Sequence, residues 1–169
     1  MHEKNKKVIC CDIYGNKKEV DSSQLTFRPS VYGVLIEDNK ILLSKQWDGY
    51  DFPGGGIEIY ETIEQALKRE FLEETGIEVE LIEPIAYETA FFHPAHSKKY
   101  NNQYWNCPLM YFLVKKIGGN ISNYQLSDEE LNYADKPKWI CLDQIGTIKF
   151  YNSINSIQIV KRAAKLEYI

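Results

Sequence analysis

The sequence predicts a single α/β domain over residues 1–169, with strands of mixed order. The chain is 44% hydrophobic and 26% charged, which is typical of a soluble domain large enough to bury a core. Runs rich in β-branched and aromatic residues alternate with two stretches of helical periodicity. Because no internal repeat, low-complexity tract or linker interrupts them, these elements are expected to form one unit.

The N-terminal segment predicts a β-hairpin. Residues 7–14 (KVICCDIY) are β-like, and Gly15-Asn16 suits a turn. The chain then returns through Val20 as a second short strand. We therefore expect a hairpin within an N-terminal extension over residues 1–28.

A second strand pair is predicted at 30–36 and 41–44. The polar segment 37–40 between them suits a tight turn. An aromatic connection over 47–52 follows and runs into the glycine turn at 53–56. We expect this turn to end the first sheet region.

The first helix is predicted over residues 62–75. Thr62 followed by Gln65 forms a plausible capping box at its start. Gly76 suits the position just past its end, where a left-handed conformation is common.

The rest of the chain is predicted to hold further strands and a last helix. A loop is expected over 93–106, and residues 120–135 are polar without a clear pattern. A helix is expected over 152–167, starting at Asn152 or Ser153, with an apolar stripe of Ile154, Ile157, Val160 and Ala164. The predicted strands are 79–92 with a break or bulge near Pro84, 109–115 ended by Gly118-Gly119, and 138–142.

The charge balance limits the partners. The formal net charge is −4, so a broad electrostatic surface for a nucleic acid polymer or an anionic membrane is not expected. No run reaches the roughly 18 apolar residues of a membrane span, and the N-terminus lacks the apolar region of a signal peptide. The four cysteines show no metal-binding spacing, which favours free thiols in a reducing cytoplasm.

Carboxylates interrupt the apolar face of the first helix. At 100° per residue, Ile63, Ala66 and Leu67 point toward the body of the protein, and Glu70 and Glu74 follow on the same side. Acidic residues at a helix C-terminus also oppose the helix dipole. An arrangement made only for packing would keep apolar residues there.

Two interpretations of this cluster remain open. Glu70, Glu73 and Glu74 supply oxygen ligands at helical spacing, which suits a hard cation such as Mg²⁺ or Mn²⁺. Arg69 can reach Glu73 one helical turn on and hold it in place. The alternative is a solvated acidic helix end without a ligand. The glycine turn before the helix favours a site, because glycines let a backbone approach a phosphate closely.

These residues form a recognisable motif. Gly55, Glu61 and the run REFLEETGI over 69–77 match the pattern GX5EX7REUXEEXGU at every defined position. The chain therefore resembles the Nudix, or MutT-like, hydrolases. Tyr60 departs from the pattern, since the family often has glycine just before the first glutamate.

The resemblance implies a fold, a reaction and roles for residues. The implied fold is an α/β/α sandwich around a mixed sheet, and the implied reaction is Mg²⁺-dependent hydrolysis of a nucleoside diphosphate linked to another group. The expected metal ligands are the carbonyl of Gly55 and the carboxylates of Glu70, Glu73 and Glu74. Arg69 is expected to orient a carboxylate, and Glu61 to support the loop–helix geometry or a further ion.

The general base and the catalytic status remain open. Within the family the base is the residue matching Glu70 or a residue of a downstream loop, and here Asp128, Glu129 and Glu130 lie in such a loop. Some Nudix domains sense nucleotides without cleaving them, which gives a non-catalytic module as the alternative. The complete set of motif carboxylates favours an enzyme.

Substrate contacts are expected outside the motif. Lys98 and Tyr100 could meet a phosphate and a base, or belong to a surface loop or dimer contact. Arg28 could meet a phosphate or pair with a carboxylate, and Trp47 could line the pocket or pack in the core. A nucleotide sugar or a (d)NTP is the expected substrate, and a homodimer through the N-terminal hairpin is possible.

Overall fold

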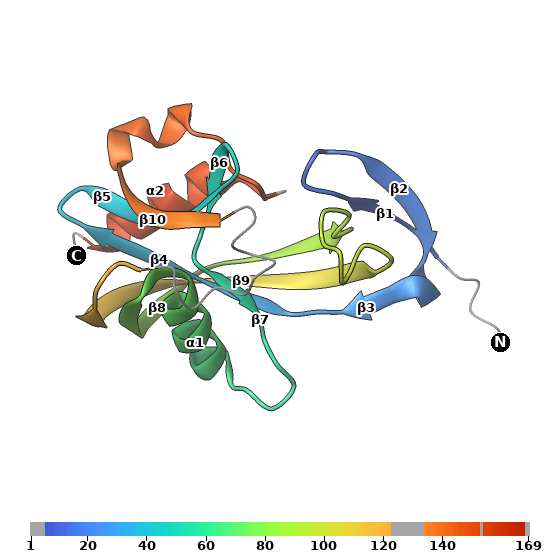
Figure 1. Cartoon of the computed structure of the whole chain (residues 1–169), viewed down its shortest axis with the longest axis horizontal. Coiled ribbons are helices and arrows are strands. Elements are labelled where there is room, and N and C mark those ends of the chain that lie inside the picture. Colours follow the sequence, from blue (N-terminus) through green and yellow to red (C-terminus); the bar gives the residue numbers. More distant parts are fainter. Residues whose placement is uncertain (1–5, 123–133, 153, 168–169) are drawn as a thin grey trace.

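The computed structural model describes residues 6–122, 134–152 and 154–167. Its described strands form one mixed sheet with two α-helices packed on it (Figure 1). The opening hairpin is present, as β1 (Lys7–Cys11) and β2 (Lys17–Asp21) pair antiparallel. A 3-10 turn, η1 (Ser22–Gln24), leads into β3 (Leu25–Phe27).

The central strands follow the predicted second pair. β4 (Ser30–Glu37) and β5 (Lys40–Gln46) pair antiparallel around a turn in which Asp38 and Asn39 have positive φ. The predicted connection over 47–52 contains a strand, β6 (Gly49–Asp51), which pairs back on β5. The glycine turn itself is a short strand, β7 (Gly54–Gly56), paired with β4.

The longest strands come after the first helix. β8 (Ile77–Phe92) and β9 (Tyr104–Gly119) pair antiparallel, with register shifts on both sides of Pro84 where a break was predicted. The predicted loop is shorter than expected, because residues 104–106 already pair with β3 and β8 as strand. β10 (Ala134–Cys141) pairs with β5, and the sheet order is β10-β5-β4-β9-β8-β1-β2.

The first helix, α1 (Ile63–Thr75), begins and ends where the sequence predicts. Thr62 and Gln65 form the capping box, and Gly76 takes a left-handed conformation with φ 72°. Ala66, Leu67 and Phe71 are fully buried against one face of β4. Ile63 was predicted to face the core but is 40% exposed, because the helix packs on the sheet through its later turns.

The last helix differs from its prediction. It follows the 3-10 segment η3 (Leu142–Thr147) and spans α2 (Ser156–Glu167), starting later than Asn152. The Asn155 side chain accepts the Gln158 N–H at 3.2 Å and so caps the first turn. The predicted stripe is also wrong in part, since Ile157 is 36% exposed. Apolar residues lie on both sides of this segment, so periodicity alone does not set its rotation; the buried residues are Ile159, Val160 and Ala163.

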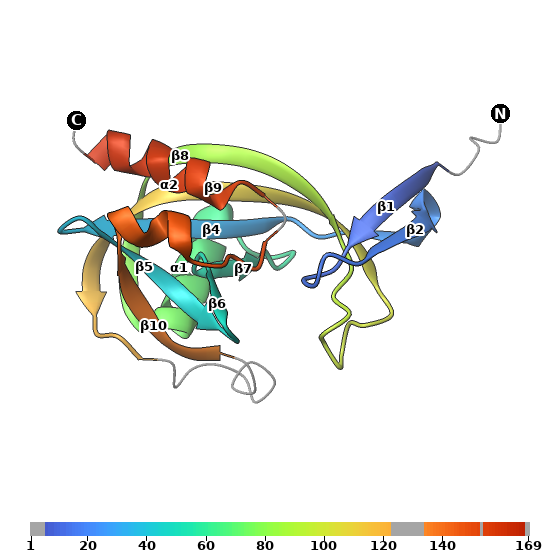
Figure 2. The ribbon, with the colours of Figure 1, turned by 90° about the horizontal axis from the view of Figure 1, so that it is seen from above.

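The two helices cover opposite faces of the sheet (Figure 2). Side chains of β4 alternate between them, with Val31 and Leu35 toward α1 and Val34 and Ile36 toward the cluster that includes α2. Gly33 lies on the α1 side, where the Phe71 ring occupies the space that a Cβ would need. This layering is the α/β/α sandwich expected from the sequence, with the β1–β2 hairpin at the end opposite the C-terminus (Figure 1).

Candidate active site

The glycine turn lies directly against the carboxylates of α1. A Cβ placed on Gly55 would lie 2.6 Å from the Glu70 carboxyl carbon, so only glycine leaves room for that carboxylate. Gly54 has φ 147° and would bring a Cβ to 2.2 Å from the Val31 carbonyl oxygen. Pairing with β4 fixes both residues, and the turn therefore presents its backbone to Glu70.

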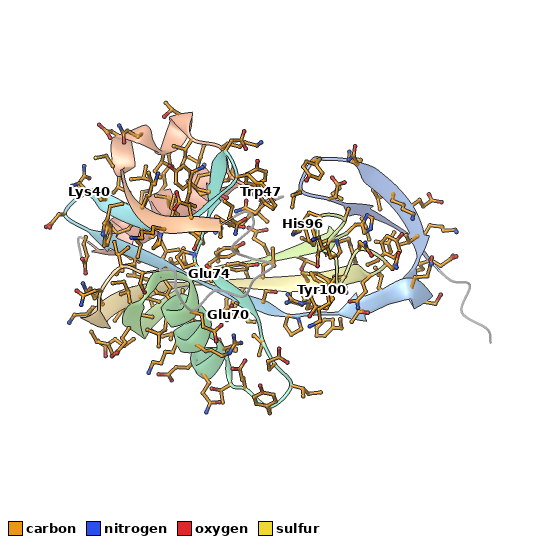
Figure 3. All side chains as sticks on the ribbon, in the orientation of Figure 1. Lys40, Trp47, Glu70, Glu74, His96 and Tyr100 are labelled. Carbon is orange, nitrogen blue, oxygen red and sulfur yellow. The ribbon has the colours of Figure 1, made fainter. Side chains whose placement is uncertain are left out.

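Glu74 is held next to this turn from two directions. Its Oε2 accepts the Ser44 hydroxyl at 2.6 Å and the Gly54 N–H at 3.2 Å. Burial raises the pKa of Glu74 well above its usual value, and the nearby charges of Glu70 and Asp51 add to the rise. Figure 3 shows Glu70 and Glu74 together beside β7. A carboxylate in this position is stabilised by a cation.

Arg69 ties the loop before α1 to the helix. Its guanidinium donates to both oxygens of Glu61, at 2.6 and 2.8 Å, and to the Gly56 carbonyl at 3.2 Å. The Arg69 hydrogen bonds lower the pKa of Glu61 to about 2. Nη1 of Arg69 also lies 2.8 Å from Glu70 Oε1 and 3.3 Å from Glu73 Oε2. Glu61 thus links the loop before α1 to the helix through Arg69, and its role in the reaction stays a prediction.

These contacts separate the three predicted carboxylate ligands. Glu70 lies against Gly55 and Glu74 beside Gly54, whereas the side chain of Glu73 is 41% exposed and contacts Arg69, which Glu70 also contacts. Across the described ranges, no three side chains of His, Cys, Asp or Glu form a group that could hold a metal ion. Glu70 and Glu74 carry hard oxygen donors of the kind that Mg²⁺ and Mn²⁺ prefer, and the ligand roles of Gly55, Glu70, Glu73 and Glu74 stay predictions. The predicted candidates for the base, Asp128, Glu129 and Glu130, lie outside the described residues.

An aromatic cavity of about 180 Å³ lies beside the carboxylates. It is assembled from segments far apart in the sequence: β4, the β5–β6 turn, β8, β9 and the stretch before α2. Tyr32 and Tyr111 stack in it, with ring centroids 5.2 Å apart. Trp47, a predicted substrate contact, lies at its wall and meets the rings of His96 and Tyr151 edge-on.

Arg28 joins the cavity to the glycine turn. Its guanidinium lies over the Trp105 ring, 4.4 Å from the centroid, and fills the space that a Cβ on Gly56 would need. Within the described ranges no ion pair includes Arg28, so the alternative of a carboxylate partner is not supported. Its charge is available to an anion that spans the cavity and the turn.

The other two predicted substrate contacts lie elsewhere. Tyr100 packs edge-on against Trp105 at 5.5 Å, and Lys98 is exposed on the loop between β8 and β9. Neither is among the described residues that line the cavity. Tyr100 therefore supports the wall formed by Trp105 from behind.

Asp51 and Asn152 are two of the polar cavity residues that sequence reasoning missed. Asp51 ends β6 and lines the cavity, and burial raises its pKa to about 6. Asn152 donates to it at 2.8 Å from the segment before α2. The two positions are 101 residues apart, so spacing in the chain gives no sign of the pair.

Other predictions concern the whole chain. All four cysteines are free thiols. No helix in the described part of the chain is long and apolar enough to cross a membrane.

Comparison with known proteins places this site in a family. The model of the NUDIX domain matches residues 26–161. An ADP-ribose pyrophosphatase of Methanocaldococcus jannaschii is 38% identical over 68 residues, which cover 36% of this chain and 40% of that protein. An 8-oxo-dGTP diphosphatase of Buchnera aphidicola is 31% identical over 128 residues, covering 72% of this chain and 81% of that protein.

Solved structures agree in fold. An ADP-ribose pyrophosphatase from Streptococcus suis superposes with a TM-score of 0.61 at 17% identity, covering 84% of this chain and 92% of that one. A MutT protein from Bacillus halodurans gives 0.58 at 22% identity, covering 79% and 80%. The alignment to the Methanocaldococcus protein spans well under two thirds of its length. With the domain model matched over most of the chain and the motif assembled in space, this protein belongs to the Nudix family.

Proposed function

We propose that the protein is a Nudix pyrophosphohydrolase that cleaves a phosphoric anhydride bond in a small nucleotide, with Mg²⁺ or Mn²⁺ as its cofactor. A nucleotide sugar or a (d)NTP is the proposed substrate class. The names of relatives that act on ADP-ribose and on 8-oxo-dGTP support a nucleotide. The start of the family match at residue 26 supports treating residues 1–28 as an extension.

One observation carries the proposal. Glu74 is held by Ser44 and Gly54 with its pKa raised, next to Glu70 and the glycine turn. Keeping a carboxylate in such surroundings costs free energy unless a cation or proton compensates it. A site that binds a cation and an anionic substrate together explains this arrangement, whereas a solvated acidic helix end does not.

The residues of the site have distinct tasks in this proposal. The Glu61–Arg69 pair fixes the loop that leads into α1, so that Gly55 faces Glu70. Arg28 contacts a phosphate from the cavity side. A divalent ion bound there would neutralise charge on the pyrophosphate and make a bound water more acidic. Glu70 is the candidate base among the described residues, since it lies beside the turn.

A hydrolysis screen tests the proposal. Purified protein is incubated with (d)NTPs, ADP-ribose, nucleotide sugars, dinucleoside polyphosphates and a 5′-triphosphorylated RNA, each with Mg²⁺, Mn²⁺ or EDTA. Products are identified by chromatography and by phosphate release. We expect metal-dependent cleavage of one small-nucleotide class and none in EDTA.

The other outcomes decide between alternatives. Cleavage of the RNA alone would show that the substrate is a polymer, against the expectation from the net charge of −4. Nucleotide binding without any cleavage would support the non-catalytic sensing module. The cytoplasmic location and the homodimer through the hairpin stay predictions.

A further inference from the structure

The aromatic cavity contains one fixed polar group that the proposed hydrolysis does not use. Asp51 Oδ1 accepts the Phe52 N–H and the Asn152 amide, both at 2.8 Å. Asn152 in turn accepts the buried Ser156 hydroxyl at 2.6 Å, at the start of α2. Two elements distant in sequence therefore fix the orientation of one carboxylate.

The second oxygen of this carboxylate remains available. Oδ2 of Asp51 makes no hydrogen bond with any described residue, although Asp51 lines the cavity. A half-buried carboxylate oxygen in aromatic surroundings is stabilised by an N–H or O–H donor. The cavity therefore favours a ligand that brings such a donor to Asp51.

The aromatic lining and the volume of the cavity indicate that its ligand contains a flat ring. Tyr32 and Tyr111 stack in it, and Trp105 and Trp47 also line it. Aromatic walls stack well on planar rings. At about 180 Å³, the cavity is below the roughly 300–1,000 Å³ of pockets that enclose a whole drug-sized molecule. It suits one part of a nucleotide.

The position of Arg28 indicates which part of the nucleotide the cavity takes. The Arg28 guanidinium lies over Trp105 and against Gly56, between the cavity and the glycine turn. A nucleotide with its base in the cavity would pass its phosphates by Arg28 toward Glu70 and Glu74. Figure 3 shows Trp47 and His96 on the cavity side and the two glutamates near β7.

Resting on the proposed function, we propose that the cavity takes the nucleobase and that Asp51 Oδ2 accepts an N–H from its exocyclic amino group. Adenine, guanine and cytosine carry such a group. Uracil and thymine place a carbonyl oxygen where cytosine has its amino group, and their ring N–H lies between two carbonyl oxygens that a carboxylate repels. The protein therefore selects nucleotides with amino-bearing bases over those of uracil and thymine.

Binding without catalysis tests this inference. The protein is titrated in EDTA with AMP, GMP, CMP, UMP, dTMP and IMP. The signal is intrinsic tryptophan fluorescence, to which Trp47 and Trp105 of the cavity contribute. We expect at least one of AMP, GMP and CMP to bind about tenfold or more tightly than UMP and dTMP. If a purine is preferred, IMP, which lacks the exocyclic amino group, should bind about tenfold or more weakly than that purine.

A variant pair assigns the effect to Asp51. Asp51→Asn keeps an oxygen for the Phe52 and Asn152 donors and replaces the other oxygen with an amide donor. It should lower the preference to about threefold or less, since an amide can donate to the uracil carbonyl. The matched control Asp38→Asn, on the exposed β4–β5 turn, should leave the preference unchanged.

Several results would overturn the inference. The first is equal binding of UMP and the best amino-bearing nucleotide, and the second, when a purine is preferred, is binding of IMP as tight as that of AMP and GMP. The third is no binding of any nucleotide. The fourth is an unchanged preference in folded Asp51→Asn. The comparisons with UMP and, for a preferred purine, with IMP need no variant, so they decide even if Asp51→Asn does not fold. Selective binding without metal-dependent cleavage would contradict the proposed function alone, and cleavage without base preference would contradict this inference alone.

Discussion

The two halves of the candidate site are built in different ways. The carboxylate half comes from one continuous stretch, residues 54–74, in which a turn and a helix place Gly55, Glu70 and Glu74 together. The aromatic half comes from segments between Ile13 and Asn152, joined only by the folding of the sheet. The first is a local structure fixed by charges and glycines, and the second is a product of tertiary packing.

This difference predicts that substitutions in the two halves have different effects. In the carboxylate half each side chain has several charged or backbone partners, so one change disturbs the reaction or the stability of the loop. In the cavity the ring contacts are spread over many residues, so single changes should alter the binding of substrates more than the reaction rate. Variants in each half test this contrast.

The largest effect is expected at Glu74. Glu74→Gln keeps the size of the side chain and removes the charge beside Glu70. It should lower turnover by about two orders of magnitude or more, near 2.7 kcal/mol, because the proposed cation loses a ligand. Steady-state kinetics measures the turnover, and circular dichroism checks that the variant is folded. Glu64→Gln, exposed on the same helix, is the control, and full activity in Glu74→Gln would refute the role.

A smaller effect, on stability, is expected at Glu61. Glu61→Gln weakens its bonds to Arg69 and should cost about 1.5–3 kcal/mol at neutral pH, because the pair is charged and 9% of the Glu61 side chain is exposed. The folded-state pKa of Glu61, about 2, lies below its ordinary value of 4.5. This stability is therefore present above pH 4.5 and is lost as the pH falls toward 2.

Urea denaturation at several pH values measures that prediction. The difference in unfolding free energy between wild type and Glu61→Gln should shrink steadily below pH 4.5. A difference that stays constant down to pH 3 would show that the pair does not act through the charge of Glu61.

An effect on binding is expected in the aromatic half. Arg28→Ala removes the cation between the cavity and the glycine turn and should raise KM about tenfold, near 1.4 kcal/mol, with a much smaller change in kcat. The reason is that a phosphate contact made equally in the ground state and the transition state changes only binding. Arg162→Ala, exposed on α2, is the control. An equal fall in kcat and kcat/KM would instead place Arg28 in the reaction itself.

The smallest effect is expected at the surface of α1. Lys68 pairs with Glu64 at 2.6 Å, one helical turn apart and exposed. Lys68→Ala should cost no more than about 0.5 kcal/mol, since exposed pairs are screened by water and salt. Urea denaturation of Lys68→Ala and Glu61→Gln, measured in parallel, compares two ion pairs that each include a residue of α1. A comparable loss in both variants would show that burial does not distinguish them.

The sequence predicts well what short spacings control. The α1 boundaries, its capping box and the left-handed Gly76 follow from a few neighbouring residues, and the structure confirms them. The motif positions Glu61, Arg69 and Glu70 are close in sequence, so the loop before α1 and the helix itself bring them together. The register shifts around Pro84 likewise follow from the missing N–H of one residue.

Local patterns were less reliable where packing decides. Ile63 fits the apolar stripe of α1 but is exposed, because the sheet lies under the later turns of the helix. The start of α2 was placed too early, since Asn152 bonds to Asp51 and Ser156 while Asn155 caps the helix. Lys98 and Tyr100 are not among the described residues that line the cavity, and their role in binding a substrate stays a prediction.

The family, the helix that carries the carboxylates and the glycine turn before it can be read from the sequence, because neighbours along a chain meet through local backbone geometry. The position of Arg28 between the cavity and the turn, and the contact of Asp51 with Asn152 at the cavity, depend on the folded sheet. Residues 101 positions apart meet only when the whole sheet has formed, and no spacing in the sequence encodes that contact.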